Sequence, residues 1–203
     1  MRPDAARSAL VLLADRVVMW RGPSLTGTDV DLLVADGQRA AVEAVLADAG
    51  LARRADGHWA SESGDVLLDL IAAGEWPRAY PGVDGVLRRA AREDPELPPV
   101  AAPEDRLLIF AADAVGGRPA AKLAAKLRPL AADPDVLARA GPLARAEGAI
   151  GLLRLAADPD ALEASARRDA LPYTRALLAA LRSRCARSAL RARVAARLAQ
   201  KIR

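Results

Sequence analysis

Two aspartates separated by a single residue are the first feature of this sequence that could support chemistry. Asp29 and Asp31 lie in the otherwise apolar stretch 29–34, which is typical of a buried β-strand. Residues two apart in a strand project from the same face, about 6–7 Å apart along the chain. Two carboxylates so placed can bind Mg²⁺, which prefers hard oxygen ligands together with nucleotide phosphates. The alternative is a strand start at which both aspartates face water.

A third aspartate, Asp69, lies in the middle of the apolar run 66–71. An ionised side chain inside a buried strand needs a partner or a metal ion. If the two strands are neighbours, Asp69 lies beside Asp29 and Asp31. Three carboxylates can then hold two metal ions that clamp the attacking and leaving oxygens of a phosphoryl group. Asp65 competes for this role, although the residues before it are typical of a turn.

These acids need elements to hold them, and the spacing of apolar residues predicts a mixed α/β unit. Short apolar or β-branched runs predict three strands, at 17–20, 30–34 and 66–71. The polar segment 51–64 fits short hairpin strands. Helical spacing predicts one helix that starts near Pro3 and another over 38–49, with Gly50 as its C-terminal cap.

The composition changes after residue 95, where a proline-rich linker begins. From Pro103 onward Ala, Leu, Arg and Asp recur at helical spacing, which predicts four or five helices up to the end of the chain. Four dipeptides are typical of helix boundaries: Asp133-Pro134, Gly141-Pro142, Asp158-Pro159 and Leu171-Pro172. We therefore expect an α+β protein, with a small mixed-sheet domain over 1–95 and an all-helical domain over 103–203.

The composition also excludes several classes of protein. The chain has 203 residues, of which 52% are hydrophobic and 28% charged, as in a globular protein and unlike a disordered one. The single cysteine, Cys185, cannot form an internal disulfide, and the single histidine, His58, argues against a His-rich zinc site. No run of about 18 apolar residues is present, so we expect no membrane span and a cytoplasmic protein.

The positive net charge comes from the end of the chain. Eight basic residues follow position 181 with no acid among them, whereas the whole chain carries a net charge of only +4. Apolar residues recur there every fourth position and form a stripe, at Leu190, Val194, Leu198 and Ile202. The stripe fits packing on the helical domain or on a second copy of the chain. Binding of the basic side chains to nucleic-acid phosphates is the alternative.

Three segments, taken in order, form a recognisable pattern: Gly22-Pro23-Ser24, then Asp29-Val30-Asp31-Leu32, then Leu68-Asp69-Leu70. The pattern resembles the polymerase-beta-like nucleotidyltransferase superfamily. Its signature is a glycine-serine turn after the first strand, an Asp-x-Asp pair on the second strand and a later lone aspartate. The segment 20–34 looks like that of a poorly characterised bacterial subgroup of this superfamily. Members of the subgroup have a Pro-Glu-Asp helix start after the catalytic domain, and Pro103-Glu104-Asp105 is similar to it. Pro23, between the glycine and the serine, departs from the family pattern.

The resemblance implies a metal-dependent enzyme that moves a nucleoside monophosphate from a nucleoside triphosphate, such as ATP, to an acceptor. Asp29, Asp31 and Asp69 would hold two Mg²⁺ ions, and Asp69 would also help to activate the acceptor hydroxyl. Gly22 and Ser24 would contact the nucleotide phosphates. The acceptor stays open among a small molecule, a protein and RNA.

Two basic side chains are further candidates for contact with the nucleotide phosphates. Arg21 directly precedes the glycine turn, and an ion pair with a nearby aspartate is its alternative role. Lys122 lies one helical turn before Lys126 and could reach phosphates from the helical domain, or it could belong to a solvated helix face.

Two other functions fit the sequence. The fold could be retained as a non-catalytic nucleotide-binding or interaction module, for which the departure at Pro23 is the argument. The chain could instead be a nucleic-acid-binding protein that acts through its basic C-terminal helix.

Overall fold

The computed structural model describes residues 4–21, 29–62, 64, 67–116, 118, 120–166 and 191; of these, the side chains of residues 4–6, 29, 165 and 166 are not described. The elements form a mixed α/β fold with one five-stranded sheet, which confirms the expectation of a mixed sheet accompanied by helices. The chain divides into two compact units. One comprises Met1–Trp76 and Val83–Ala102, and the other comprises Pro77–Gly82 and Pro103–Arg203.

The first unit contains the sheet, whose strands lie in the order β1-β2-β5-β4-β3. β1 (Val17–Met19) is antiparallel to β2 (Asp29–Val34), and β2 is parallel to β5 (Leu67–Ala72). A hairpin of β3 (Ala52–Arg53) and β4 (Trp59–Ala60) completes the sheet beside β5. The three predicted strands are confirmed to within one residue at each end. The short hairpin strands expected within 51–64 are present as β3 and β4.

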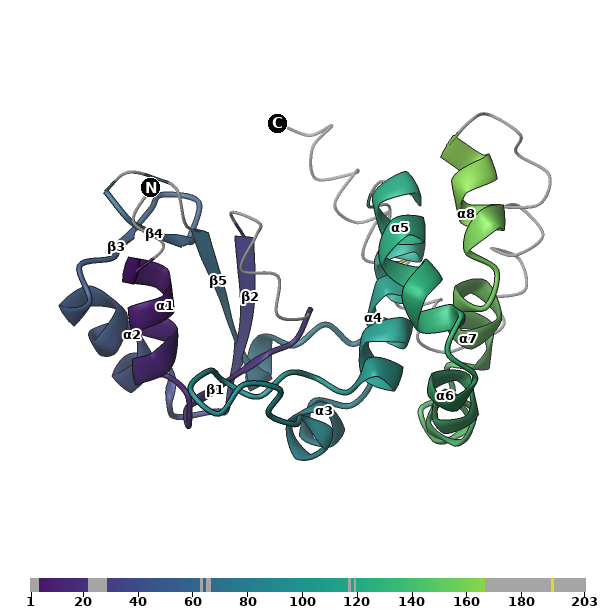
Figure 1. Ribbon diagram of the computed structural model, residues 1–203, viewed down its shortest axis with the longest axis horizontal. Coiled ribbons are helices and arrows are strands. Elements are labelled where there is room, and N and C mark those ends of the chain that lie inside the picture. The colour runs from purple at the N-terminus through teal and green to yellow at the C-terminus, as the bar shows by residue number, and fades with distance from the viewer. Residues whose placement is uncertain are drawn as a thin grey trace. The chain divides into compact units, whose positions relative to one another are not determined.

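Two helices, α1 (Asp4–Leu12) and α2 (Arg39–Asp48), cover one face of the sheet (Figure 1). Alternate side chains of β2 and β5 join these helices in one hydrophobic core, among them Val30, Leu32, Val34, Leu68 and Leu70. Because successive side chains of a strand point to opposite faces, Asp31 and Asp69 project from the other face. The alternation thus places both acids away from the α1–α2 layer.

The end of α2 and two further short helices complete the first unit. Gly50 follows α2 with a φ of 80°, and the Leu51 N–H donates to the Leu46 carbonyl at 3.0 Å, which confirms the predicted glycine cap. The 3-10 helix η1 (Ala73–Glu75) follows β5. A further helix of this unit, α3 (Val83–Arg89), is not foreseen in the sequence.

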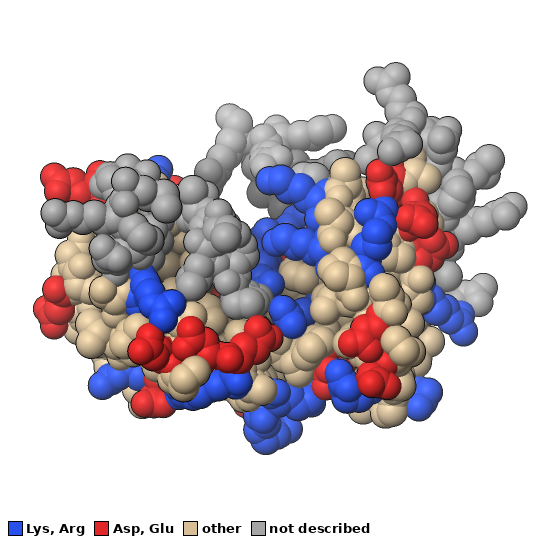
Figure 2. Space-filling view, viewed as in Figure 1, with Lys and Arg blue, Asp and Glu red and all other residues tan. Residues whose placement is uncertain are grey.

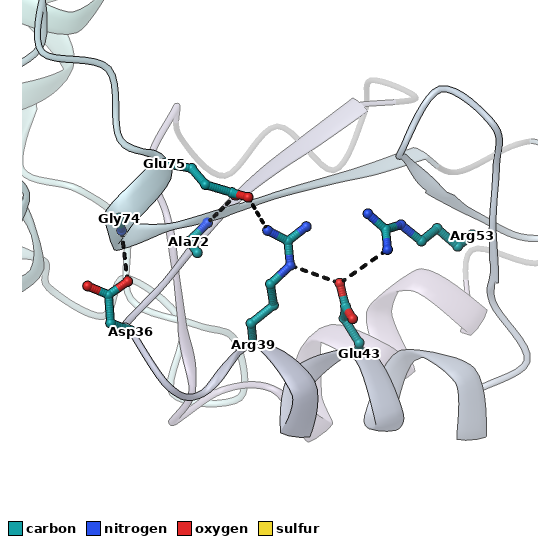
Figure 3. Close-up of polar contacts among 7 residues, drawn as sticks. All are labelled: Asp36, Arg39, Glu43, Arg53, Ala72, Gly74 and Glu75. Carbon is teal, nitrogen blue, oxygen red and sulfur yellow. Dashed lines mark hydrogen bonds and ion pairs between the residues drawn. The ribbon is translucent and has the colours of Figure 1, made fainter.

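A polar cluster connects the ends of β2 and β5, the two strands that carry the aspartates (Figure 3). Asp36, just after β2, accepts a hydrogen bond from the Gly74 N–H at 2.7 Å. Glu75 accepts one from the Ala72 N–H at 3.1 Å and another from Arg39 at 2.5 Å. Since Asp36 follows β2 and Ala72 ends β5, these contacts help to hold the two parallel strands in register.

The charge of Glu75 makes the stability of the first unit depend on pH. The hydrogen bonds from the Ala72 N–H and then from Arg39 lower the pKa of Glu75 below its ordinary value of 4.5. Because the pKa is lower in the folded protein, this stabilisation is full well above pH 4.5 and is lost as the pH falls through the folded pKa. The Glu75 side chain is 55% exposed, so we expect Glu75→Gln to reduce the free energy of unfolding at neutral pH by less than about 1 kcal/mol.

Urea unfolding of the wild type and Glu75→Gln at neutral pH, and at several pH values below 4.5, measures this effect. The difference between the two proteins should shrink to zero as the medium becomes acidic. A difference that is the same at every pH would show that the charge of Glu75 does not contribute.

The second unit is helical and has α4 (Pro103–Gly116) at its centre. α4 contacts α5 (Ala120–Ala131), α6 (Pro134–Ala146) and α7 (Ile150–Ala156), and α5 contacts α8 (Pro159–Ala166) (Figure 1). All residues of 107–115 are buried, which is typical of a helix at the centre of a helical unit, and all but Asp113 are apolar. The segment Pro77–Gly82 belongs to this unit, and in it the Tyr80 hydroxyl donates to the buried Asp113 carboxylate.

Aspartate-proline pairs begin two of these helices, as predicted. At the start of α6 the Asp133 carboxylate accepts hydrogen bonds from the Asp135 N–H at 2.9 Å and the Val136 N–H at 3.3 Å. At the start of α8 the Asp158 carboxylate accepts one from the Ala161 N–H at 3.1 Å. Each aspartate therefore satisfies main-chain donors that have no partner within their own helix.

We expect Asp133→Ala to reduce the free energy of unfolding by about 1 kcal/mol, because the helix loses its N-terminal cap. Asp135→Ala is the matched control: it removes the same charge from an exposed position two residues later, where the side chain is not the cap. Urea unfolding followed by circular dichroism compares the two variants. Equal losses would assign the effect to charge near the helix terminus instead of to capping.

The prediction that Gly141-Pro142 marks a helix boundary is wrong, since both residues lie inside α6. An internal proline removes one main-chain hydrogen bond, and the burial of Ala140 and Ala144 on either side keeps the helix together. Five helices already lie within 103–166, where four or five were predicted up to residue 203. The predicted helix boundary at Leu171-Pro172 and the predicted apolar stripe at Leu190, Val194, Leu198 and Ile202 lie outside the described residues. Within the described ranges, no helix has the length and apolar character needed to cross a membrane.

Candidate functional site

The structure brings two of the predicted site residues, Asp31 and Asp69, together on neighbouring strands. The parallel register of β2 and β5 pairs their Cα positions directly, and paired strands lie about 4.8 Å apart. Asp31 is only 8% exposed, whereas Asp69 is half-buried. Two carboxylates this close repel each other, and the buried one needs compensation by a cation or by hydrogen-bond donors.

Arg21 supplies a cation to this pair of acids. Its Nη1 donates to Asp31 Oδ1 at 2.7 Å, and the two side chains are only 6% and 8% exposed. The sequence left two roles open for Arg21, contact with phosphate or an ion pair with a nearby aspartate, and the structure shows the ion pair. A charge-assisted bond between buried groups fixes the orientation of both side chains.

Trp20, which follows β1 and directly precedes Arg21, contacts the Arg21 guanidinium. The main-chain N–H of Trp20 donates to the main-chain carbonyl of Asp31 at 3.2 Å, which extends the β1–β2 pairing by one residue. This pairing places the Trp20 indole on the same face of the sheet as the Asp31 side chain. The Arg21 guanidinium carbon lies 4.0 Å from the centre of the Trp20 ring, a cation–π contact. Trp76 packs edge-on against Trp20, with ring centres 5.3 Å apart. Trp20, Asp31 and Asp69 thus form a row across three adjacent strands.

Sequence analysis did not identify the two tryptophans as part of this site. Trp20 ends a predicted strand and begins the segment 20–34 that carries the resemblance, and its position directly before Arg21 is the available signal. Trp76 follows η1 and lies far along the chain from Trp20, so nothing in the sequence connects the two rings. Their contact arises from the folding of β5 against β2.

Three predicted site residues lie wholly or partly outside the described residues. Gly22 and Ser24 are not described at all. Asp29 begins β2, where its backbone pairs with Leu67, but its side chain is not described. Among the side chains that are described, no three carboxylate, imidazole or thiol groups gather closely enough to hold a metal ion. The three-acid site for two Mg²⁺ ions stays a prediction.

The chemistry of the described acids fits one Mg²⁺ ion. Magnesium in proteins is commonly held by one or two carboxylates, with substrate phosphates and water completing its shell. Asp31 and Asp69, directly opposite each other on one face, offer such a pair of carboxylates. Arg21 already compensates one of them, so a metal ion at Asp31 would meet a carboxylate that has an established partner.

Lys122, the remaining predicted site residue, is exposed on α5 in the second unit. Figure 2 shows basic side chains on the surface of this unit where α5 lies, with acidic side chains beside them near α8. Arg128 of α5 forms ion pairs with Asp160 and Glu163 of α8. Lys126 Nζ lies 5.3 Å from the centre of the Phe110 ring. These contacts are typical of a solvated helix face, and a role of Lys122 in phosphate binding stays a prediction.

The described residues thus offer two carboxylates in register, a guanidinium on one of them and two indoles beside that guanidinium. All of these groups belong to the first unit, the one built on the five-stranded sheet. In comparisons with known proteins, no family model, no curated protein and no solved structure matches this chain.

Proposed function

We propose that this chain is a magnesium-dependent nucleotidyltransferase, which moves a nucleoside monophosphate from a nucleoside triphosphate to an acceptor hydroxyl. The observation that supports the proposal is the direct pairing of Asp31 with Asp69 across β2 and β5. Like charges opposite each other destabilise a sheet, and a divalent cation held between the two carboxylates would offset this repulsion. The resemblance of segments 20–34 and 68–70 to the nucleotidyltransferase superfamily is the second support.

The two acids would have different roles because their environments differ. Asp31 is buried and lies on an interior strand of the sheet, so it would act as a metal ligand. Asp69 is more exposed and would lie beside the acceptor hydroxyl. A bound Mg²⁺ ion would supply positive charge against the phosphate oxygens of the transition state. Gly22 and Ser24 would contact the nucleotide phosphates.

The reaction is a substitution at the α-phosphorus of the triphosphate. The acceptor oxygen forms a bond to this phosphorus, and the bond between it and the oxygen that bridges to the β-phosphate breaks. Pyrophosphate leaves with the electron pair of the broken bond. The Asp69 carboxylate would take the proton of the acceptor hydroxyl, as a general base within hydrogen-bond reach of it.

Magnesium-dependent release of pyrophosphate tests this function. The full chain is incubated with each of the common nucleoside triphosphates and with acceptors of the three classes left open, in Mg²⁺ and in chelator. We expect release in Mg²⁺ only, and its loss in Asp29→Ala and Asp31→Ala. Pyrophosphate release that is unchanged in both variants would reject the assignment.

The buried Arg21–Asp31 pair favours a second candidate, a nucleotide-binding module without turnover. An arginine that permanently neutralises Asp31 would remove one metal ligand, and turnover would be lost while the fold was kept. Titration calorimetry separates the two candidates. Triphosphate binding without pyrophosphate release would establish the module.

A further inference from the structure

We propose that Arg21 is a built-in counter-ion that competes with the divalent cation for Asp31, so that the metal binds only as the guanidinium releases this carboxylate. The inference rests on the proposed function, because it assigns a regulation to the same acid pair. It adds an order of events: Arg21 holds Asp31 in the free protein and transfers to another anion when the metal enters.

The first argument is the burial of the ion pair. Both side chains are at most 8% exposed, and the bond between Arg21 Nη1 and Asp31 Oδ1 is 2.7 Å long. In surroundings that exclude water the attraction between two charges is strong, and removal of one partner leaves the other uncompensated. A divalent cation that approaches Asp31 must therefore displace an established partner.

The second argument is the position of Asp69. Its Cα is paired directly with that of Asp31, so a cation shared by the two acids would lie close to a carboxylate that already carries Arg21. Two positive groups on one buried carboxylate repel each other. The affinity for the metal is lower while Arg21 stays in place.

The third argument is the support beneath the guanidinium. Trp20 is 1% exposed, and its main-chain N–H donates to the main-chain carbonyl of Asp31. The Arg21 guanidinium carbon lies 4.0 Å from the centre of the Trp20 ring. The indole thus gives Arg21 a defined resting place on the sheet. A guanidinium that leaves this ring finds a matching partner in a phosphate, which binds it in bidentate fashion.

Binding of Mn²⁺, measured by electron paramagnetic resonance of the full chain, tests this competition without reference to activity. We expect Arg21→Met to lower the dissociation constant for Mn²⁺ by about tenfold, because a positive charge next to the site is removed. Arg16→Met is the matched control, since it removes the same charge from an exposed position ahead of β1 and should leave Mn²⁺ binding unchanged. Asp69→Asn should abolish the Mn²⁺ site both in the wild-type chain and in Arg21→Met.

Tryptophan fluorescence of the otherwise unaltered chain gives a second measurement, which does not depend on the folding of Arg21→Met. Mg²⁺ should change the emission of Trp20 as Arg21 leaves its ring, and Trp20→Phe should lose this change while it still binds Mn²⁺. If Mn²⁺ binds through Asp31 and Asp69 with no change at Trp20, or Arg21→Met does not bind it more tightly, the competition is overturned and the proposed function stands. If no protein shows a Mn²⁺ site that Asp69→Asn removes, both the competition and the proposed function fall.

Discussion

Asp31→Asn and Asp69→Asn should each reduce kcat/KM for pyrophosphate release by at least about 100-fold, since each removes negative charge from the place where the proposed metal ion and nucleotide would meet. The asparagine side chain has nearly the shape of aspartate, so the packing around β2 and β5 is preserved. In Asp31→Asn the amide oxygen can still accept the hydrogen bond from Arg21. Because Asp31→Asn removes this counter-charge from the buried Arg21 guanidinium, urea unfolding of each variant is measured beside its activity, and a loss of kcat/KM in a folded variant reports on charge.

The double variant sharpens this prediction. Residues that act as one unit are not additive, because removing either one already disables the unit. The variant that carries both Asp31→Asn and Asp69→Asn should therefore lose little more activity than the more damaged single variant. Two losses that multiply would indicate that the acids act independently, contrary to a shared cation.

Asp48→Asn is the matched control for these variants. Asp48 is exposed at the end of α2, in the same unit but on the helix layer that covers the opposite face of the sheet. We expect kcat/KM to stay within about twofold of the wild-type value, because the charge is remote from the reacting atoms and screened by solvent. A comparable loss in Asp48→Asn would mean that net charge, and not the acid pair, governs the reaction.

Trp20→Ala should reduce the free energy of unfolding by about 3–5 kcal/mol, the range observed when a buried tryptophan is truncated. Trp20 is 1% exposed and contacts both the Trp76 ring and the Arg21 guanidinium. Its truncation removes the aromatic pair, leaves a cavity and takes away the cation–π partner of a buried arginine. Urea unfolding followed by far-ultraviolet circular dichroism measures the loss.

Two variants calibrate the effect of Trp20→Ala. Trp20→Phe keeps an aromatic face for Arg21 and should lose less stability than the alanine variant. Leu12→Ala, at a position that is 60% exposed on α1, should change the stability by no more than about 0.5 kcal/mol. If Trp20→Ala unfolds at the same urea concentration as Leu12→Ala, the aromatic contacts do not stabilise the sheet.

Several parts of this protein were determined by the sequence itself. The strands at 17–19, 29–34 and 67–72 follow from short apolar runs, and the starts of α6 and α8 follow from aspartate-proline pairs. Such features depend on hydrogen bonds and side-chain periods within a few residues, which a single sequence displays. The candidate acids Asp31 and Asp69 were found for the same reason, since a charged residue within an apolar strand is conspicuous.

Local patterns were insufficient where packing between distant segments decides. Gly141-Pro142 carries the local marks of a helix boundary, yet α6 continues through it because Ala140 and Ala144 are buried. The segment Pro77–Gly82 lies within the domain predicted over 1–95, and its contacts assign it to the helical unit. In both cases tertiary contacts outweigh the intrinsic preference of a short stretch.

The acid pair itself shows where the sequence ends and the tertiary structure begins. That Asp31 and Asp69 each lie in a strand was readable from their neighbours. Their position directly opposite each other depends on the register between β2 and β5, which no single strand determines. A slip of one residue would move every side chain of the shifted strand to the other face of the sheet. The partner of Asp31 was likewise decided by the fold, because only the pairing of β1 with β2 brings Trp20 and Arg21 to the face that carries the acids.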